Sequence, residues 1–294
     1  MGRSLLLSSI LFCLLVLPVL GQTEDRFLFQ SAEQRFQNGD YVAAIERYDQ
    51  LLRDFPSSDL VPDVQFRRGV SLYQLGRYTE SLELLTRVQT RYRSTRFLPY
   101  VPYYIGLAHF KTEAYERCIE YLQQVDVRNS GIMSEARLYI GRSYLELGIV
   151  SEANRILGEL MMQEGAPAEV RGFAAALHIS SLYDDQDYQL ILAIREMLPI
   201  AELSENWAKQ VLLLFAETYY ALGEDDAARE LYAQLTDEQE MIASAAFQRL
   251  YQLANRSGSQ EAAQAAVREA EHAMAGKSAQ LQKLWLRVGL DSFE

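Results

Sequence analysis

One turn followed by one amphipathic helix recurs along this chain, and this recurrence constrains the fold more than any other feature. The first copy, residues 39–56, opens with Gly39-Asp40 and ends at Pro56. The start of its helix recurs every 35 to 38 residues, at Tyr41, Tyr78, Tyr115, Val150, Tyr188 and Asp225. A period of this length is typical of arrays in which each unit stacks only on its neighbours. The sequence therefore predicts one elongated array rather than two globular domains.

Two columns of mostly small residues keep the same register. One lies three residues after each helix start, at Ala44, Ser81, Cys118, Ala153, Ile191 and Ala228. The other lies nine residues before it, at Ala32, Gly69, Gly106, Gly141, Ile179 and Ala216. Two helices joined by a short turn can approach closely only where side chains are small. The columns thus predict helix hairpins, with the fifth unit degenerate because it has isoleucine in both.

This pattern resembles the tetratricopeptide repeat (TPR) family, over roughly residues 25–270. The resemblance implies an all-α fold, a right-handed α-solenoid of helix–turn–helix repeats. The long inter-repeat turn over residues 55–63 is similar to that of exported envelope TPR proteins of the BamD type and of the Tol–Pal-associated periplasmic type.

The domain boundaries follow from the helix pattern. We expect a repeat array of about seven helix pairs over residues 22–275, then a capping helix and tail over residues 276–294. The expected pairs are 25–37 with 41–54, 62–75 with 78–91, 99–112 with 115–126, 133–147 with 150–163, 167–183 with 187–198, 205–222 with 225–235, and 238–255 with 259–275. No stretch alternates apolar and polar residues as a half-buried strand does.

Residues 1–21 have the composition of a secretory signal peptide. Arg3 precedes a nearly continuous apolar run from Leu5 to Leu20, and small residues follow. We expect cleavage before Gln22 and a periplasmic or envelope location, with no stable span in the mature chain. An uncleaved membrane anchor is the main alternative. Lipidation at Cys13 is disfavoured because Phe12 precedes it, where a lipobox has a small residue.

Charge and motifs argue for binding rather than catalysis. The net charge of −12 disfavours nucleic acid as a partner. The three histidines lie in different units without a neighbouring metal ligand, and residues 275–278 imitate a phosphate loop but lack its first glycine. We expect no cofactor, no metal and no enzymatic activity. Cys118 occupies a small-residue column, so we interpret it as a buried apolar residue rather than a reactive thiol.

Aromatic residues form the first candidate binding surface. They recur seven residues apart on the first helices of the first three units, at Phe29, Phe36, Phe66, Tyr73, Tyr103 and Phe110. Spacing of seven keeps them on one helix face. In a TPR-like array that face lines a concave groove able to accept an extended or helical segment of a partner protein. Packing between successive units is the alternative.

Basic residues form the second candidate surface, at Arg87, Arg91, Arg93 and Arg96. In a chain this acidic the cluster reverses the local charge and could dock an acidic partner. The alternative is a solvated helix end, where positive charge is favourable beside terminal carbonyls.

Together these features predict a non-catalytic protein-binding scaffold of the bacterial cell envelope, active in assembly of envelope complexes. An accessory subunit of a cell-wall or secretion enzyme complex is the alternative. We expect a monomer, because no heptad segment that would drive self-assembly is present.

Overall fold

The computed structural model describes residues 24–236, 240–258 and 260–273. All regular structure within these ranges is helical, and the fold class is an α-solenoid, as predicted. The chain divides into two compact units, residues 1–149 and 150–294. Every helix in the described ranges is too short or too polar to span a bilayer. The expected signal peptide and the expected capping helix over 276–294 lie outside the described residues.

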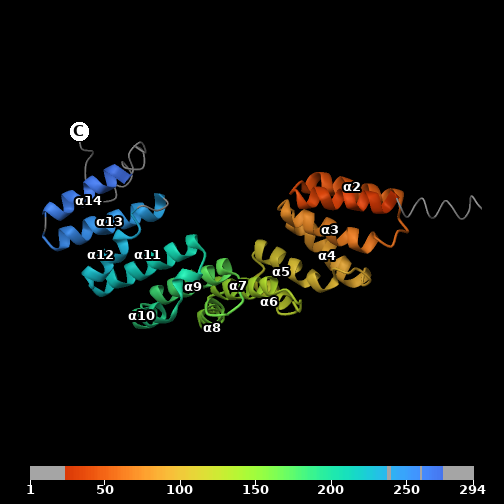
Figure 1. Cartoon of the computed structure of the whole chain (residues 1–294). Helices are drawn as coiled ribbons and strands as arrows, with labels where there is room; N and C mark the ends of the chain where they lie inside the picture. Colours follow the sequence, from red (N-terminus) through yellow and green to blue (C-terminus); the bar gives the residue numbers. More distant parts are fainter. Residues whose placement is uncertain (1–23, 237–239, 259, 274–294) are drawn as a thin grey trace, which may run out of the picture. The chain divides into compact units, whose positions relative to one another are not determined.

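Unit 1 begins with a helix over residues 24–37. Its further elements are α2 (Tyr41–Asp54), α3 (Val61–Gln74), α4 (Tyr78–Arg91), η1 (Leu98–Tyr100), α5 (Val101–Lys111), α6 (Tyr115–Leu122) and α7 (Ser130–Glu146). Each helix packs on the next, from α2 through α7 (Figure 1).

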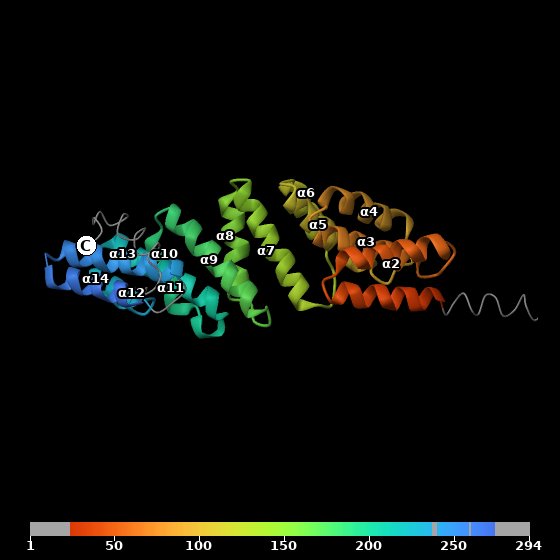
Figure 2. The same cartoon turned by 90° about the horizontal axis from the view of Figure 1, so that it is seen from above.

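Unit 2 is built in the same way. Its elements are α8 (Val150–Met161), α9 (Ala168–Asp184), α10 (Tyr188–Met197), η2 (Ile200–Glu202), α11 (Glu205–Leu222), α12 (Asp225–Ala233), α13 (Glu240–Arg256) and α14 (Gln260–Ala273). The pairs α8–α9, α11–α12 and α13–α14 lie side by side, and α9 also packs on α11 (Figure 2).

The helix boundaries agree with the expected ones to within a few residues, with two informative differences. α6 ends at Leu122 rather than at residue 126. α7 begins at Ser130, three residues earlier than expected, because the Asn129 side chain accepts a hydrogen bond from the Ile132 amide at 3.2 Å. Such a side-chain cap satisfies an amide at the helix start that otherwise lacks a partner.

One turn geometry joins the two helices of each of the first six repeats. In the first repeat the Gly39 amide donates to the Phe36 carbonyl at 3.0 Å and the Asp40 amide to the Arg35 carbonyl at 3.0 Å. This pair of bonds is the Schellman motif, which places its central residue in the left-handed region. That residue is Gly39, with φ +77°. The same bonds recur at residues 76, 113, 148, 186 and 223, where Glu113 and Gln186 replace glycine at φ +60°.

The small-residue columns lie where the helices of a hairpin touch. A Cβ added to Gly69 would come within 2.7 Å of Leu85 Cδ2, and one added to Gly106 within 2.6 Å of Leu122 Cδ2. Ser81 Oγ also donates to the Gly69 carbonyl at 2.8 Å, which ties α4 to α3. In the fifth repeat Ile179 and Ile191 are fully buried, so both small-residue columns stay in the core there despite the larger side chains.

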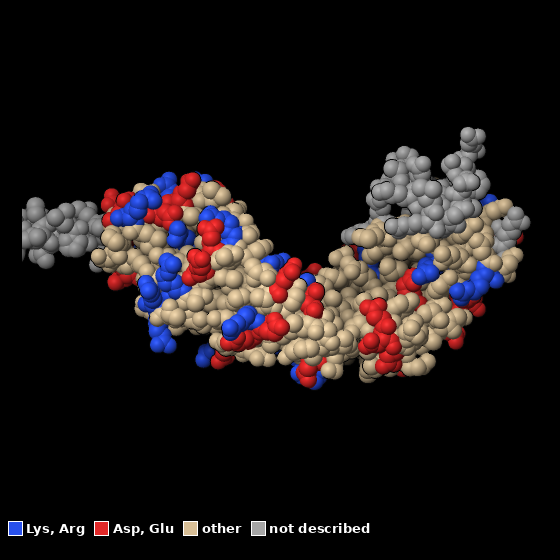
Figure 3. All heavy atoms as spheres, turned by 180° about the vertical axis from the view of Figure 1, so that it is seen from behind, with Lys and Arg blue, Asp and Glu red and all other residues tan. Residues whose placement is uncertain are grey.

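Several charged residues form ion pairs at the surface. Ion pairs three or four residues apart recur along the outer helices, for example Arg77 with Glu80 and Arg155 with Glu152. On the face drawn in Figure 3, acidic and basic side chains lie interspersed among the other residues. Exposed pairs of this kind contribute little to stability, because water and salt screen the attraction.

Candidate partner-binding surfaces

Most of the predicted groove aromatics are buried between helices. Phe66 is 1% exposed; its ring stacks on Phe97 at 4.8 Å between centroids and meets Tyr104 edge-on at 5.7 Å. Phe29, Tyr103 and Phe110 are also buried. These contacts favour the alternative of packing between repeats for the four residues. Their role in binding a partner stays a prediction.

Phe36 and Tyr73 are the two predicted aromatics that remain half-buried. Each contacts the first tyrosine of its own second helix, Phe36 with Tyr41 and Tyr73 with Tyr78, both at 5.4 Å between centroids. Tyr73 also meets Tyr104 of the next repeat at 6.2 Å. These two rings are therefore the aromatic candidates with surface still available to a partner.

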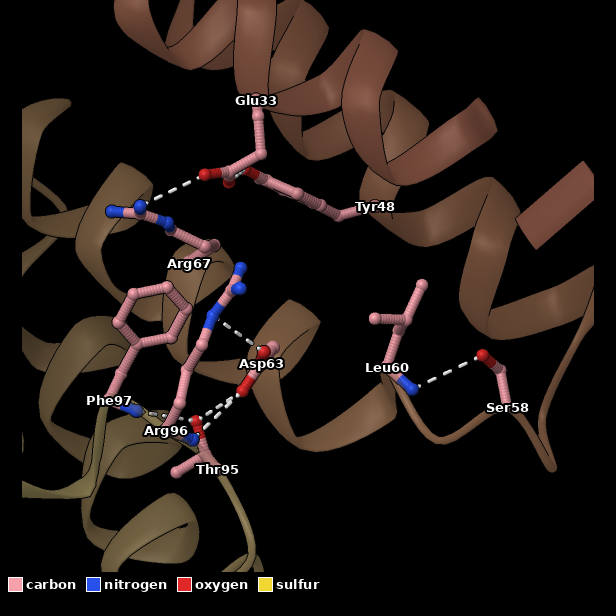
Figure 4. A network of polar contacts seen from close by, with 9 residues as sticks. All are labelled: Glu33, Tyr48, Ser58, Leu60, Asp63, Arg67, Thr95, Arg96 and Phe97. Atoms are coloured by element: carbon pink, nitrogen blue, oxygen red, sulfur yellow. Dashed lines mark hydrogen bonds and ion pairs between the residues drawn. The ribbon is translucent and has the colours of Figure 1, made fainter. Parts of the chain in front are cut away.

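The predicted basic cluster separates into two parts. Arg87, Arg91 and Arg93 are exposed, and none forms an ion pair with a described residue. Arg96 instead turns toward α3, where its Nε lies 3.0 Å from Asp63 Oδ2 and its guanidinium lies 4.8 Å from the Phe97 ring (Figure 4). The structure therefore does not present all four arginines as one free patch.

Asp63 fastens the loop after α4 to the first turn of α3. Its Oδ1 accepts from Thr95 Oγ1 at 2.7 Å and from the Arg96 amide at 3.2 Å. Thr95 Oγ1 in turn accepts from the Phe97 amide at 3.2 Å, which sets the Phe97 ring against Phe66. Sequence reasoning missed Asp63, because a partner about 33 residues away leaves no local signal.

A second polar network, also missed, joins the first two repeats. Glu33 accepts from Tyr48 Oη at 2.5 Å and pairs with Arg67 Nη2 at 2.9 Å (Figure 4). The Arg67 guanidinium lies 4.9 Å from the centre of the Phe36 ring. Burial, and then the hydrogen bond to Glu33, raise the pKa of Tyr48 well above its ordinary value, so it stays a neutral donor.

Unit 2 repeats this network with different residues in the same register. Glu217 accepts from Tyr232 Oη at 2.8 Å and takes two bonds from Arg249, 2.6 Å from Nη2 and 2.9 Å from Nε. Arg249 lies 4.3 Å from the Tyr220 ring. In both units the glutamate precedes the ring by three residues and the tyrosine by fifteen. That spacing is the sequence signal that would have found the network.

The buried Cys118 and His178 lie outside these two networks. Burial raises the pKa of the Cys118 thiol to about 11, in keeping with its interpretation as a core residue. Burial lowers the pKa of His178, whose Nδ1 lies 3.0 Å from Asn154 Oδ1. Among the described residues, no three histidine, cysteine, aspartate or glutamate side chains gather as metal ligands.

Comparison with known families assigns the repeats. Tetratricopeptide repeat models match residues 29–94 and residues 210–239. These two stretches are therefore similar to tetratricopeptide repeats. The first match spans the hairpins that carry Phe36 and Tyr73, and the second includes Glu217 and Tyr232. Comparison with curated protein sequences finds no match.

Solved tetratricopeptide repeat structures share the fold at low identity. The C-terminal part of a TPR repeat-containing protein from Cytophaga hutchinsonii aligns with a TM-score of 0.66 at 16% identity, over 86% of this chain and 98% of that one. A tetratricopeptide repeat protein from Parabacteroides merdae gives 0.53 at 15%, over 90% and 99%. The apo quorum sensor NprR from B. thuringiensis gives 0.54 at 14%, over 91% and 87%. At these identities the similarity describes the fold alone.

Proposed function

We propose that this protein is a non-catalytic scaffold of the bacterial cell envelope that holds a segment of a partner protein against its first helices. Each repeat contributes one first helix at a position set by its neighbours, and arrays of this kind bind through the resulting extended surface. The export signal predicted at residues 1–21 supports the envelope location.

The observation that carries the proposal is the equivalent placing of Phe36 and Tyr73. Each lies four residues after the small residue of its first helix and is held by a ring contact to its own second helix. Rings that are fixed in place and still half-buried offer apolar area without losing much conformational freedom on binding. Phe66, whose core cluster Phe36 packs against, and Tyr104, which meets Tyr73 edge-on, support these two rings.

The test begins with crosslinking in cells from position 73, followed by identification of the captured protein and measurement of its affinity in purified form. We expect Tyr73→Ala to weaken binding about thirtyfold, since truncating an aromatic hot spot costs about 2 kcal/mol. Tyr183→Ala is the matched control. Tyr183 has the same register and a similar ring contact with the first tyrosine of its second helix, at 5.5 Å between centroids, but belongs to unit 2.

Equal loss of affinity in both variants, or a loss that only follows a lower melting temperature, would contradict the proposed surface. The envelope location is tested separately by mass spectrometry of the envelope fraction. We expect a mature chain that begins near Gln22, and an intact Met1 or an acylated Cys13 would contradict it.

A further inference from the structure

The first repeat carries a polar cavity on a face separate from the rings discussed above. It lies between the helix over residues 24–37 and α2, and its volume is about 450 Å³. Its lining consists of Arg35, Ala43, Glu46, Arg47, Gln50 and Arg53. The α2 members after Ala43 lie three, four, seven and ten residues further along, so they share one face of that helix. A space of this size accommodates several side chains of a bound segment.

Arg35 is an exception to its column in the repeats. It lies three residues after Ala32, and the equivalent residues of the later repeats are Leu72, His109, Tyr144, Leu182 and Tyr219. All of these are buried or half-buried, whereas Arg35 is exposed. The first repeat therefore presents a cation where the others present an apolar or aromatic surface.

Arg47 is an exception in the matching column of the second helices. It lies three residues after Ala44, and its equivalents are Leu84, Tyr121, Ile156, Ile194 and Leu231. Tyr121 packs against a core cluster that includes Phe66 and Leu85 of the preceding repeat. The column thus faces a neighbour in the stack, and in the first repeat this same face carries the cavity.

The cavity has more positive charge than its own carboxylates neutralise. Arg35 has a single contact with Asp40, at 3.3 Å between two half-exposed side chains. Arg47 donates to the neutral Gln50 at 2.9 Å, and neither Arg53 nor Glu46 forms an ion pair with a described residue. Three arginines therefore face one glutamate within the lining.

The net negative charge of the chain is unevenly divided between its two halves, and the cavity lies in the half without it. Residues 1–149 contain 17 basic and 17 acidic residues, whereas residues 150–294 contain 11 and 23. The whole excess of negative charge, −12, thus belongs to the second half of the chain. The cationic cavity therefore belongs to the half of the chain whose own charges sum to zero.

We propose that this cavity binds an acidic segment of a partner protein, through carboxylates that pair with Arg47 and Arg53. The planar guanidinium group matches a carboxylate with two parallel hydrogen bonds, which makes arginine suited to this recognition. The proposal does not depend on the aromatic surface proposed above, because the two sites share no residue.

Fluorescence anisotropy with a labelled hexaglutamate peptide and the full chain tests the site at low salt. We expect the double variant Arg47→Ala/Arg53→Ala to weaken binding about tenfold, since each of the two substitutions removes one exposed ion pair with a glutamate of the peptide. Affinity should also fall as salt is added, because the pairs are screened. The control is Arg128→Ala/Arg268→Ala, which removes the same charge from two exposed positions outside the cavity and outside the cluster at Arg87 and Arg91.

Three results would overturn the proposal. The first is equal weakening in both double variants, which would indicate a nonspecific charge effect. The second is no peptide binding by the unaltered protein, in which case the arginines only keep this face soluble. The third is binding to phosphatidylglycerol vesicles without binding to the peptide, which would indicate a lipid surface. Thermal melting followed by circular dichroism checks that each variant is folded. We expect melting temperatures close to that of the unaltered protein, because replacing exposed arginines changes stability little.

Discussion

Substitutions at the turn between the two helices of a repeat should change the stability of the protein in opposite directions in two successive repeats. Gly76 and Glu113 occupy the same place in successive Schellman turns, with φ of +75° and +60°. An L-residue in this region costs about 1–2 kcal/mol, whereas glycine loses more chain entropy on folding, about 0.5–1 kcal/mol. We therefore expect Gly76→Ala to destabilise the protein and Glu113→Gly to stabilise it, each by about 0.5–1 kcal/mol.

The structure makes the magnitude at Gly76 easy to interpret. A Cβ added there has no heavy atom within 4 Å, so backbone conformation alone determines the effect. Thermal melting followed by circular dichroism should show opposite shifts of about 1–4 °C for the two variants. Urea titration provides a second measure, analysed with the two compact units allowed to unfold separately.

Glu113→Ala is the control that separates the backbone from the lost side chain. Alanine keeps the left-handed strain of Glu113, so this variant should gain none of the stability that Glu113→Gly gains. If Glu113→Gly is no more stable than Glu113→Ala, the argument from backbone strain is wrong.

The remaining predictions concern the core and its polar networks. Cys118→Ala should leave stability nearly unchanged because the column accepts alanine, and the thiol, with a pKa raised to about 11, should react with alkylating reagents only in strongly alkaline solution; rapid labelling at neutral pH would contradict its burial. Phe66→Ala should lower the free energy of unfolding by about 3–5 kcal/mol, measured by urea titration, since it removes a buried ring. An unchanged urea midpoint would contradict the packing role and favour the binding role of Phe66. Glu217→Ala should cost about 1–3 kcal/mol by leaving Arg249 partly buried without a carboxylate, and the loss should shrink when Arg249 is also replaced. Burial lowers the pKa of both His178 and His109 in the folded state, so unfolding takes up protons and stability should fall as pH drops below about 6.5. His178→Gln should therefore weaken that dependence between pH 7 and 5 without abolishing it, and an unchanged dependence would contradict the burial of His178.

The repeat pattern was sufficient to predict most of the fold from sequence. The turn at Gly39 and the small residues at Ala32 and Ala44 are local requirements of a helix hairpin, and they recur with a fixed period. Local requirements of this kind can be recognised without knowing the neighbours. The end of α6 and the start of α7 were less accurate because a single cap, Asn129, decided the boundary.

The candidate surfaces depended on the tertiary structure. Spacing of seven placed Phe66 and Tyr73 on one face of one helix, but it could not tell that the loop carrying Phe97 covers the first ring and leaves the second half-buried. Likewise, Arg96 looked equivalent to Arg91 in sequence, although Asp63 binds only Arg96. The sequence alone determined the repeat, its turns and its small-residue contacts, since each follows from residues within one hairpin. Only the tertiary structure decided which side chains remain free to bind, because burial and pairing depend on the residue that the next repeat places opposite.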